Sequence, residues 1–224
     1  MKSGSSAFPP GPWSCTTLLV IAKQPLPGRV KTRLVPPYTL EQAAALAEAA
    51  LADTLHAVLA APACRRVLVL DGRPGPWLPD GFEVLPQCDG ELDERLAAAF
   101  AAARGPALLI GMDTPQVTPG LLAVDWDGLD AWFGPAADGG FWALGLREPD
   151  PDLLRGVPMS NPGTGAAQRA RLSAAGLRVA TLPLLRDVDA ASDAAAVAAL
   201  APETGFAARV RDFAPVIGSR PGLP

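Results

Sequence analysis

The sequence has few of the residues on which several common kinds of site depend. Its 224 residues include one histidine, three lysines and three cysteines, and the cysteines are widely separated without a C-x-x-C pair. A histidine-rich metal centre is therefore excluded, and neither a disulfide framework nor a zinc site is expected. The single histidine, His56, falls within an alanine-rich helical pattern, which favours a surface or packing role over catalysis.

Long apolar runs and an excess of positive charge are also missing. The best early candidate for a membrane segment, residues 18–22, is far shorter than the roughly 18–20 residues that cross a bilayer. No membrane span is expected, and we predict a cytoplasmic protein. The formal net charge of −4 argues against broad electrostatic binding to nucleic acid or to anionic membranes. A small basic pocket for a phosphorylated ligand is compatible with that charge.

The length and the 49% hydrophobic content fit one α/β domain. Gly, Pro and Ser dominate residues 1–15, which predicts a disordered leader before a single domain over 16–204 and a C-terminal tail over 205–224. Apolar runs that predict buried strands alternate with helical patterns; the strands are expected at 16–23, 66–70, 82–85, 107–111, 132–134, 141–146 and 178–182. This alternation predicts a three-layer α/β/α sandwich with a mostly parallel, doubly wound sheet. Ligands of such sheets bind outside the carboxyl ends of the strands.

The loop after the first strand is the first candidate site. Residues 23–34 (KQPLPGRVKTRL) hold four cations, including two of the three lysines of the chain. A glycine that allows close backbone approach, followed by cations that lead into a helix, suits a polyphosphate. A solvated basic loop is the alternative, which we consider weaker, and no Walker pattern is present. The candidate phosphate-binding residues are Gly28, Arg29, Lys31, Thr32 and Arg33.

Carboxylates follow two of the predicted apolar strands, and another, Asp138, lies in a tight turn with Gly139 and Gly140. Asp113 comes two residues after an apolar strand, where it is placed either to hold a divalent cation or to shape the turn before Pro115. Asp187 and Asp189 follow another apolar strand and either complete the metal site or, with Ser192, cap the last helix. Mg²⁺ and Mn²⁺ prefer such oxygen ligands, so the predicted metal ligands are Asp113, Asp187 and Asp189.

Four segments, taken in order, resemble the bacterial DUF2064 family. They are residues 25–34 (PLPGRVKTRL), 111–115 (GMDTP), 134–146 (GPAADGGFWALGL) and 187–193 (DVDAASD). The resemblance extends over residues 16–200 and implies a GT-A fold, that of nucleotide-diphospho-sugar transferases. The chain is also similar to the 2-phospholactate guanylyltransferases and the molybdenum-cofactor nucleotidyltransferases.

The resemblance also implies roles for individual residues. Arg29, Lys31 and Arg33 would contact nucleotide phosphates, and Asp113, with Asp187 or Asp189, would bind the metal. The segment bordering the base would hold Gln87, Gly90 and Arg95. The residues facing the sugar or acceptor would be Asp138, Gly139 and Gly140. The sequence departs from the family pattern at Asp93, which replaces a glycine, and at Met159, which replaces a tryptophan.

These observations lead to a main hypothesis and two alternatives. The main hypothesis is a glycosyltransferase that uses a nucleotide-diphosphate sugar, with Mg²⁺ or Mn²⁺ and the basic loop stabilising the departing diphosphate. The alternatives are a nucleotidyltransferase that joins an NTP to a phosphorylated small molecule with release of pyrophosphate, and a non-catalytic nucleotide-binding protein. A small-molecule acceptor is expected, nucleic acid is not, and a homodimer stays open. The candidate catalytic residues are Lys31, Asp113 and, as general base, Asp138. Phe141 and Trp142 either stack on a sugar or pack in the core of an inner strand.

Overall fold

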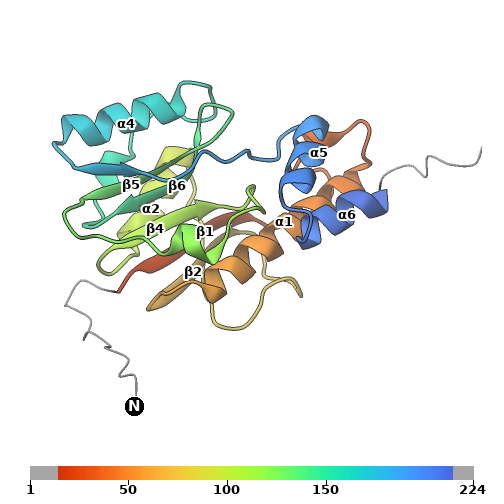
Figure 1. Cartoon of the computed structure of the whole chain (residues 1–224), viewed down its shortest axis with the longest axis horizontal. Coiled ribbons are helices and arrows are strands. Elements are labelled where there is room, and N and C mark those ends of the chain that lie inside the picture. Colours follow the sequence, from red (N-terminus) through yellow and green to blue (C-terminus); the bar gives the residue numbers. More distant parts are fainter. Residues whose placement is uncertain (1–14, 214–224) are drawn as a thin grey trace, which may run out of the picture.

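Seven strands form one sheet in the order β3-β2-β1-β4-β6-β5-β7 in a computed structural model that describes residues 15–213 (Figure 1). The strands are β1 (Thr17–Lys23), β2 (Arg65–Asp71), β3 (Glu83–Pro86), β4 (Ala107–Gly111), β5 (Ala131–Pro135), β6 (Phe141–Leu146) and β7 (Val179–Thr181). Within this sheet β6 pairs antiparallel with β4 and with β5, whereas the other neighbouring strands are parallel. The expected mostly parallel sheet is confirmed.

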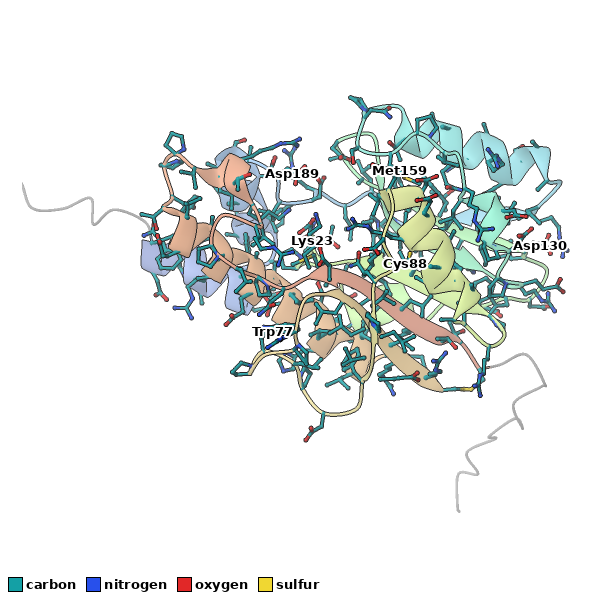
Figure 2. The ribbon with its side chains drawn as sticks, turned by 180° about the vertical axis from the view of Figure 1, so that it is seen from behind. Lys23, Trp77, Cys88, Asp130, Met159 and Asp189 are labelled. Atoms are coloured by element: carbon teal, nitrogen blue, oxygen red, sulfur yellow. A yellow bond between two sulfur atoms is a disulfide. The ribbon has the colours of Figure 1, made fainter. Side chains whose placement is uncertain are left out.

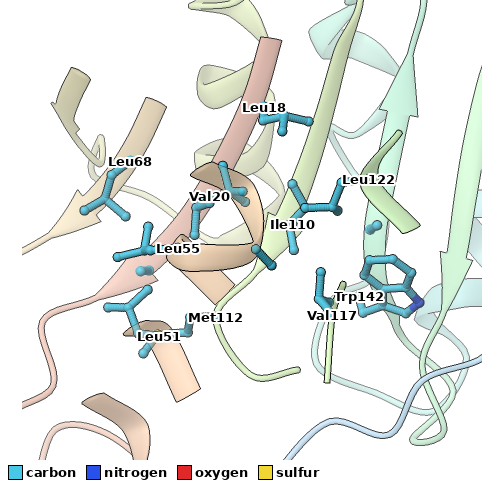
Figure 3. Packing of buried hydrophobic residues seen from close by; sticks show 14 of the residues in the cluster. Leu18, Val20, Leu51, Leu55, Leu68, Ile110, Met112, Val117, Leu122 and Trp142 are labelled. Atoms are coloured by element: carbon cyan, nitrogen blue, oxygen red, sulfur yellow. The ribbon is translucent and has the colours of Figure 1, made fainter. Parts of the chain in front are cut away.

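Helices cover both faces of the sheet, which makes three layers. The α-helices are α1 (Leu40–Ala60), α2 (Leu92–Ala101), α3 (Pro119–Leu122), α4 (Thr164–Ala174), α5 (Ala191–Leu200) and α6 (Gly205–Phe213), and two 3₁₀ turns are η1 (Thr32–Leu34) and η2 (Pro151–Leu153). Leu51 and Leu55 of α1 pack on Leu18, Val20 and other residues of one sheet face (Figure 3). Residues of α2 and α4, including Phe100 and Leu172, pack on the opposite face.

A third apolar cluster lies on the side of α1 that faces away from the sheet. There α5 and α6 pack beside α1 at one end of the molecule (Figure 1). Phe206 of α6 is fully buried in this cluster together with Leu46 of α1, and the cluster also contains Leu34 and Val188. Because Leu34 belongs to the basic loop and Val188 lies between two candidate site aspartates, this cluster supports both segments from behind.

The structure differs from the sequence-based expectation at the C-terminal end of the predicted domain. Residues 205–213 of the predicted tail form α6, whose first N–H groups, those of Gly205 and Phe206, donate to the carboxylate of Asp53. Residues 214–224, like residues 1–14 of the predicted leader, lie outside the described residues. The structure also pairs Cys15 with Cys64 as a disulfide, with Cα atoms 5.4 Å apart, and the spacing of the cysteines in the sequence did not predict this pair.

Helix α1 is long and apolar enough, by length and composition alone, to cross a membrane. The sequence-based expectation overlooked this stretch, since polar residues interrupt its apolar run. More than half of its most apolar window is buried inside the protein, between the sheet and α6. It is therefore a core helix. His56 lies on its exposed side, as expected, with Nδ1 2.7 Å from the carbonyl oxygen of Ala52.

Candidate active site

The carboxyl ends of the parallel strands bring the candidate residues to one edge of the sheet. In the parallel register Lys23 lies beside Asp71, and Ile21 lies beside Gly111. The loop after β1 and the segment after β4 therefore start next to each other. Lys23, Met159 and Asp189 come from three separate segments and lie toward this edge, whereas Asp130 lies at the far end of the sheet (Figure 2).

Lys31 is at the centre of the basic loop. Its side chain is only 8% exposed, and its backbone adopts the left-handed conformation at φ 51°, which is uncommon for a residue other than glycine. Its Nζ lies 2.8 Å from Oδ1 of Asp113 and donates a hydrogen bond of 3.1 Å to Oδ1 of Asp189. Burial alone would lower the pKa of Lys31, but these two carboxylates outweigh it and hold the pKa above its ordinary value.

Backbone pairing carries Asp187 and Asp189 to this position. The chain after β7 continues along the end of β5, where Ala137 donates its N–H to the carbonyl of Leu185. Val188 then donates its N–H to the carbonyl of Asp113, at 3.0 Å. The two segments are thus bonded to each other through their backbones, and the buried Val188 side chain anchors the pair.

Asp193 caps the start of α5, in place of the predicted Asp189 and Ser192. Asp193 accepts hydrogen bonds from the N–H groups of Asp189 and Ala190, at 3.3 and 2.8 Å. It also pairs with Arg186 at 3.0 Å. The carboxylate of Asp189 is consequently turned toward Lys31 and Arg33, with its Oδ2 3.5 Å from Nη1 of Arg33. Ser192 lies inside the first turn, so the alternative in which Asp189 and Ser192 cap this helix is wrong.

Three carboxylates meet beside this ion pair. Each of Asp138, Asp187 and Asp189 offers an oxygen within 4.8 Å of the others, an arrangement that could hold a metal ion. Burial, with a smaller contribution from the neighbouring Asp138 and Asp189, raises the pKa of Asp187 to about 6, although Lys31 acts in the opposite direction. Asp113, predicted as a metal ligand, pairs with Lys31 instead of joining this acidic trio.

Two arginines border the other side of the loop, held by Asp71 at the end of β2. Asp71 lies 3.4 Å from Nη2 of Arg29 and 3.9 Å from Nη1 of Arg95. Gln87 uses its amide N–H groups on the carbonyls of Ala22 and Val69, so it ties the ends of β1 and β2 together. Sequence reasoning missed Asp71, although it follows a buried apolar strand in the same way as Asp113.

The turn between β5 and β6 forms the wall opposite the arginines. Oδ1 of Asp138 accepts a 2.7 Å hydrogen bond from the N–H of Gly140, and the carbonyl of Gly139 accepts one of 2.8 Å from Gly165 at the start of α4. Gly139 has φ +91°, and a Cβ there would overlap the carbonyl oxygen of Pro162. This turn therefore packs directly on the loop that precedes α4.

All these groups surround one cleft of about 790 Å³. The predicted residues that line it are Arg29, Lys31, Thr32, Arg33, Gln87, Gly90, Arg95, Asp113, Asp138, Gly140, Asp187 and Asp189. Gly28 and Gly139 do not line it and act through the backbone, at φ +76° and +91°. Trp142 is 3% exposed and donates its indole N–H to Pro183, so it is a core residue rather than an exposed stacking surface.

Other lining residues were not singled out from the sequence as site residues. They include Lys23, Met112, Thr114 and the loop of residues 159–162. The loop gave a signal only through Met159, as a departure from the family pattern. Asp93, the other residue that departs from the family pattern, has a structural role. Its carboxylate accepts a 2.7 Å hydrogen bond from the N–H of Gly156 and so joins α2 to the segment after η2.

Residues 43–161, more than half of the chain, match the family described as "Uncharacterized protein conserved in bacteria (DUF2064)". The chain belongs to this family. The match spans β2 to β6 and includes Asp113 and Asp138, but it ends before Asp187 and Asp189. No curated protein matches the sequence.

Solved structures extend the comparison to the whole DUF2064 domain. A "putative nucleotide-diphospho-sugar transferase" from Desulfovibrio desulfuricans G20 is 25% identical, with a TM-score of 0.79 over 88% of this chain and 94% of its own. A CMP:2-keto-3-deoxy-manno-octonic acid synthetase complexed with CTP is 13% identical, with a TM-score of 0.55 over 85% and 99%. Rv0371C from Mycobacterium tuberculosis H37Rv, in complex with manganese, is 20% identical, with a TM-score of 0.50 over 82% and 97%.

The last two likenesses are too distant in sequence to bear on more than the fold. The first likeness, at 25% identity over most of both chains, makes this DUF2064 chain an enzyme of the transferase class. Its fold is shared by nucleotide-diphospho-sugar transferases and nucleotidyltransferases. Its sheet order and the location of its cleft at the carboxyl ends of the strands agree with that assignment.

Proposed function

We propose that the enzyme transfers a sugar from a nucleotide-diphosphate sugar to a small neutral acceptor, with Mg²⁺ or Mn²⁺ bound by the acidic trio. The observation that carries this proposal is the uneven distribution of charge around the cleft. Its lining cations are Lys23, Arg29, Lys31, Arg33 and Arg95. All of them come from the end of β1, the loop after it and helix α2.

The opposite wall is neutral or acidic. It consists of the turn at residues 136–140, Phe141, the loop of residues 159–162 and Thr164, and no lysine or arginine lines it within the described part of the chain. A phosphorylated acceptor placed there would find no lysine or arginine on that wall, and its one counter-charge would be the metal ion that the donor diphosphate already binds, which is unfavourable. A sugar and a neutral acceptor meet no such penalty, and hydroxyl, amide and aromatic groups can bind them.

The carboxylates of the acidic trio fit a hard divalent cation. Three carboxylates lie close enough to share one ion, and oxygen ligands are those preferred by Mg²⁺ and Mn²⁺. Next to them, Oγ1 of Thr114 is buried without a hydrogen-bond partner. A buried hydroxyl normally has a partner, so it favours a polar ligand in this part of the cleft.

In this proposal the protein works mainly through electrostatics. A bound divalent cation supplies Lewis-acid stabilisation of the diphosphate charge. Arg29, Arg33 and Arg95 bind the phosphate oxygens, and the β5–β6 turn, held rigid by its internal hydrogen bonds, borders the sugar side. Asp138 would hold the metal together with Asp187 and Asp189, rather than acting as the general base, and the proton of the acceptor hydroxyl would pass to the departing diphosphate. Phe141, half-buried against Phe133 at 5.8 Å, is the remaining aromatic surface for a sugar ring.

Nucleotidyl transfer is the second candidate, and the number of cations favours it. Five positive side chains line the cleft, more than a diphosphate needs, and the fold is shared with a synthetase solved with CTP. A non-catalytic nucleotide-binding role has no comparable support, because binding alone does not need three carboxylates beside a phosphate site.

Product analysis separates the two transfers. The enzyme is incubated with Mn²⁺, a panel of nucleotide sugars and neutral acceptors, and in parallel with NTPs and phosphorylated acceptors. We expect a nucleoside diphosphate released from one nucleotide sugar, detected by ion-exchange chromatography. Pyrophosphate formed from an NTP and a phosphorylated acceptor would contradict glycosyl transfer and establish nucleotidyl transfer. The Asp187→Asn variant is the negative control for either activity.

A further inference from the structure

Lys31 pairs with Asp189, which is also a member of the acidic trio (Asp138, Asp187 and Asp189). Its Nζ lies within 3.1 Å of Asp189, and Asp189 is also one of the three residues whose oxygens lie within 4.8 Å of each other. The second partner of Lys31, Asp113, lies on the neighbouring segment. The ammonium group therefore lies against the carboxylates that a divalent cation would need.

The protein fixes Lys31 in this position. Its side chain is almost fully buried, its backbone is held in the left-handed region, and Leu34, three residues later, is fully buried in the third apolar cluster. Arg33 also contacts Asp189, but its side chain is 79% exposed and can swing away into solvent. Of the two cations on Asp189, only Lys31 is buried, so it needs another anion before it can release the carboxylates.

We infer that Lys31 is a positioning residue that couples metal binding to nucleotide binding. With the cleft empty of nucleotide, its ammonium group neutralises Asp113 and Asp189 and weakens their attraction for a divalent cation. A diphosphate group in the cleft becomes the new partner of Lys31 and frees the carboxylates, so each ligand strengthens the binding of the other. This inference rests on the metal site of the proposed function.

The test measures Mn²⁺ binding to the full chain by titration calorimetry, first without any nucleotide. We expect Lys31→Met to bind Mn²⁺ at least tenfold more tightly than the wild type. Arg29→Met is the matched control, because Arg29 lines the same cleft but pairs with Asp71 and touches none of the trio. Its Mn²⁺ affinity should stay within twofold of the wild type.

The second part adds inorganic pyrophosphate as a probe for the diphosphate group. Pyrophosphate should tighten Mn²⁺ binding to the wild type at least tenfold and should have little effect on Lys31→Met. Pyrophosphate also binds Mn²⁺ in solution, but this complex is the same for both proteins and cancels in the comparison. If Lys31→Met fails to fold, Lys31→Gln removes the charge while keeping a hydrogen-bond donor for Asp113.

The outcomes distinguish the two proposals. Equal or weaker Mn²⁺ binding by the Lys31 variant, with pyrophosphate coupling unchanged, would overturn the inference and leave the metal site intact. No Mn²⁺ binding by the wild type or the variant, with or without pyrophosphate, would overturn both the inference and the metal dependence of the proposed function.

Discussion

At the residue scale, Asp187 is an acidic group whose pKa differs strongly from that of a carboxyl in water. Its pKa is about 6 in the folded protein, against 3.8 for an aspartate side chain in water, because of burial and two neighbouring carboxylates. Between pH 4 and pH 6 the folded state therefore binds more protons than the unfolded state. The stability contribution of Asp187 is fully present below pH 4 and is lost as the pH rises through 6.

Asp187→Asn should remove this dependence. Without metal, at pH 7.5, we expect the variant to be more stable than the wild type by about 1 kcal/mol, after allowing for solvent screening of a half-buried group. At pH 4 the two should be nearly equal. Urea unfolding in EDTA at both pH values measures this. Asp189→Asn is the control and should lower the stability, because it removes a partner of the buried Lys31. A loss of stability in Asp187→Asn at pH 7.5 would contradict the expected repulsion between the carboxylates.

Gly139 gives a second prediction at this scale. Gly139→Ala combines a positive φ with a direct overlap on Pro162, so it should destabilise the protein by roughly 2 kcal/mol or more. Gly28→Ala is the matched control, since Gly28 also has a positive φ but a Cβ there would meet nothing within 4 Å. It should cost about 1 kcal/mol. Similar losses of thermal stability in both variants would show that the overlap with Pro162 is relieved at no cost.

The sequence was informative about which residues reach the cleft, but less so about their partners. Asp113, Asp138, Asp187 and Asp189 all lie there, as their positions after strands or in the turn predicted. Their grouping was not predictable, because it depends on backbone bonds between segments 75 residues apart, such as that from Val188 to Asp113. Burial of Lys31 was equally hidden, since a loop with four cations looks solvated in sequence.

At the scale of elements, α6 links the outer helices to the active site. Phe206 is fully buried in the same cluster as Leu34 and Val188. Leu34 lies three residues after Lys31, and Val188 lies between Asp187 and Asp189. Phe206→Ala should destabilise the protein by about 3–5 kcal/mol and should also weaken Mn²⁺ binding, because both loops lose their support. Leu200→Ala, at a side of α5 that is 69% exposed, should change neither property. Unfolding curves and Mn²⁺ titrations measure the two effects; unchanged Mn²⁺ affinity in Phe206→Ala would show that the cluster does not position the site.

Strands and long helices were predictable because burial gives them continuous apolar runs or three-to-four spacing. Residues 205–213 were not recognised as a helix, since their apolar positions are few and the helix forms against α1, with Asp53 capping it from 152 residues away. A contact at that distance leaves no local signal. Thr118 precedes α3, which begins at Pro119, and the side chain of Thr118 makes no capping bond.

At the scale of the whole molecule, the cleft has cations on one wall, carboxylates in the middle and a neutral wall opposite. The chain carries a net charge of −4, so this local arrangement, rather than overall charge, attracts the ligand. The fold class followed from the alternation of strands and helices. The division of charge between the two walls did not, because it depends on which loops meet across the sheet edge.

Thermal unfolding with ligands tests this arrangement as a whole. A nucleoside diphosphate with Mn²⁺, at about 100 times its Kd, should add about 2.7 kcal/mol of stability, or roughly 5–11 °C in Tm for a domain of this size. The unphosphorylated nucleoside should give almost no shift, because the cations of the cleft recognise the phosphates. The shift should shrink as salt is raised, since the arginines are partly exposed and screened. A nucleoside that stabilises the protein as much as its diphosphate would show that recognition lies on the base and that the charged wall has another ligand.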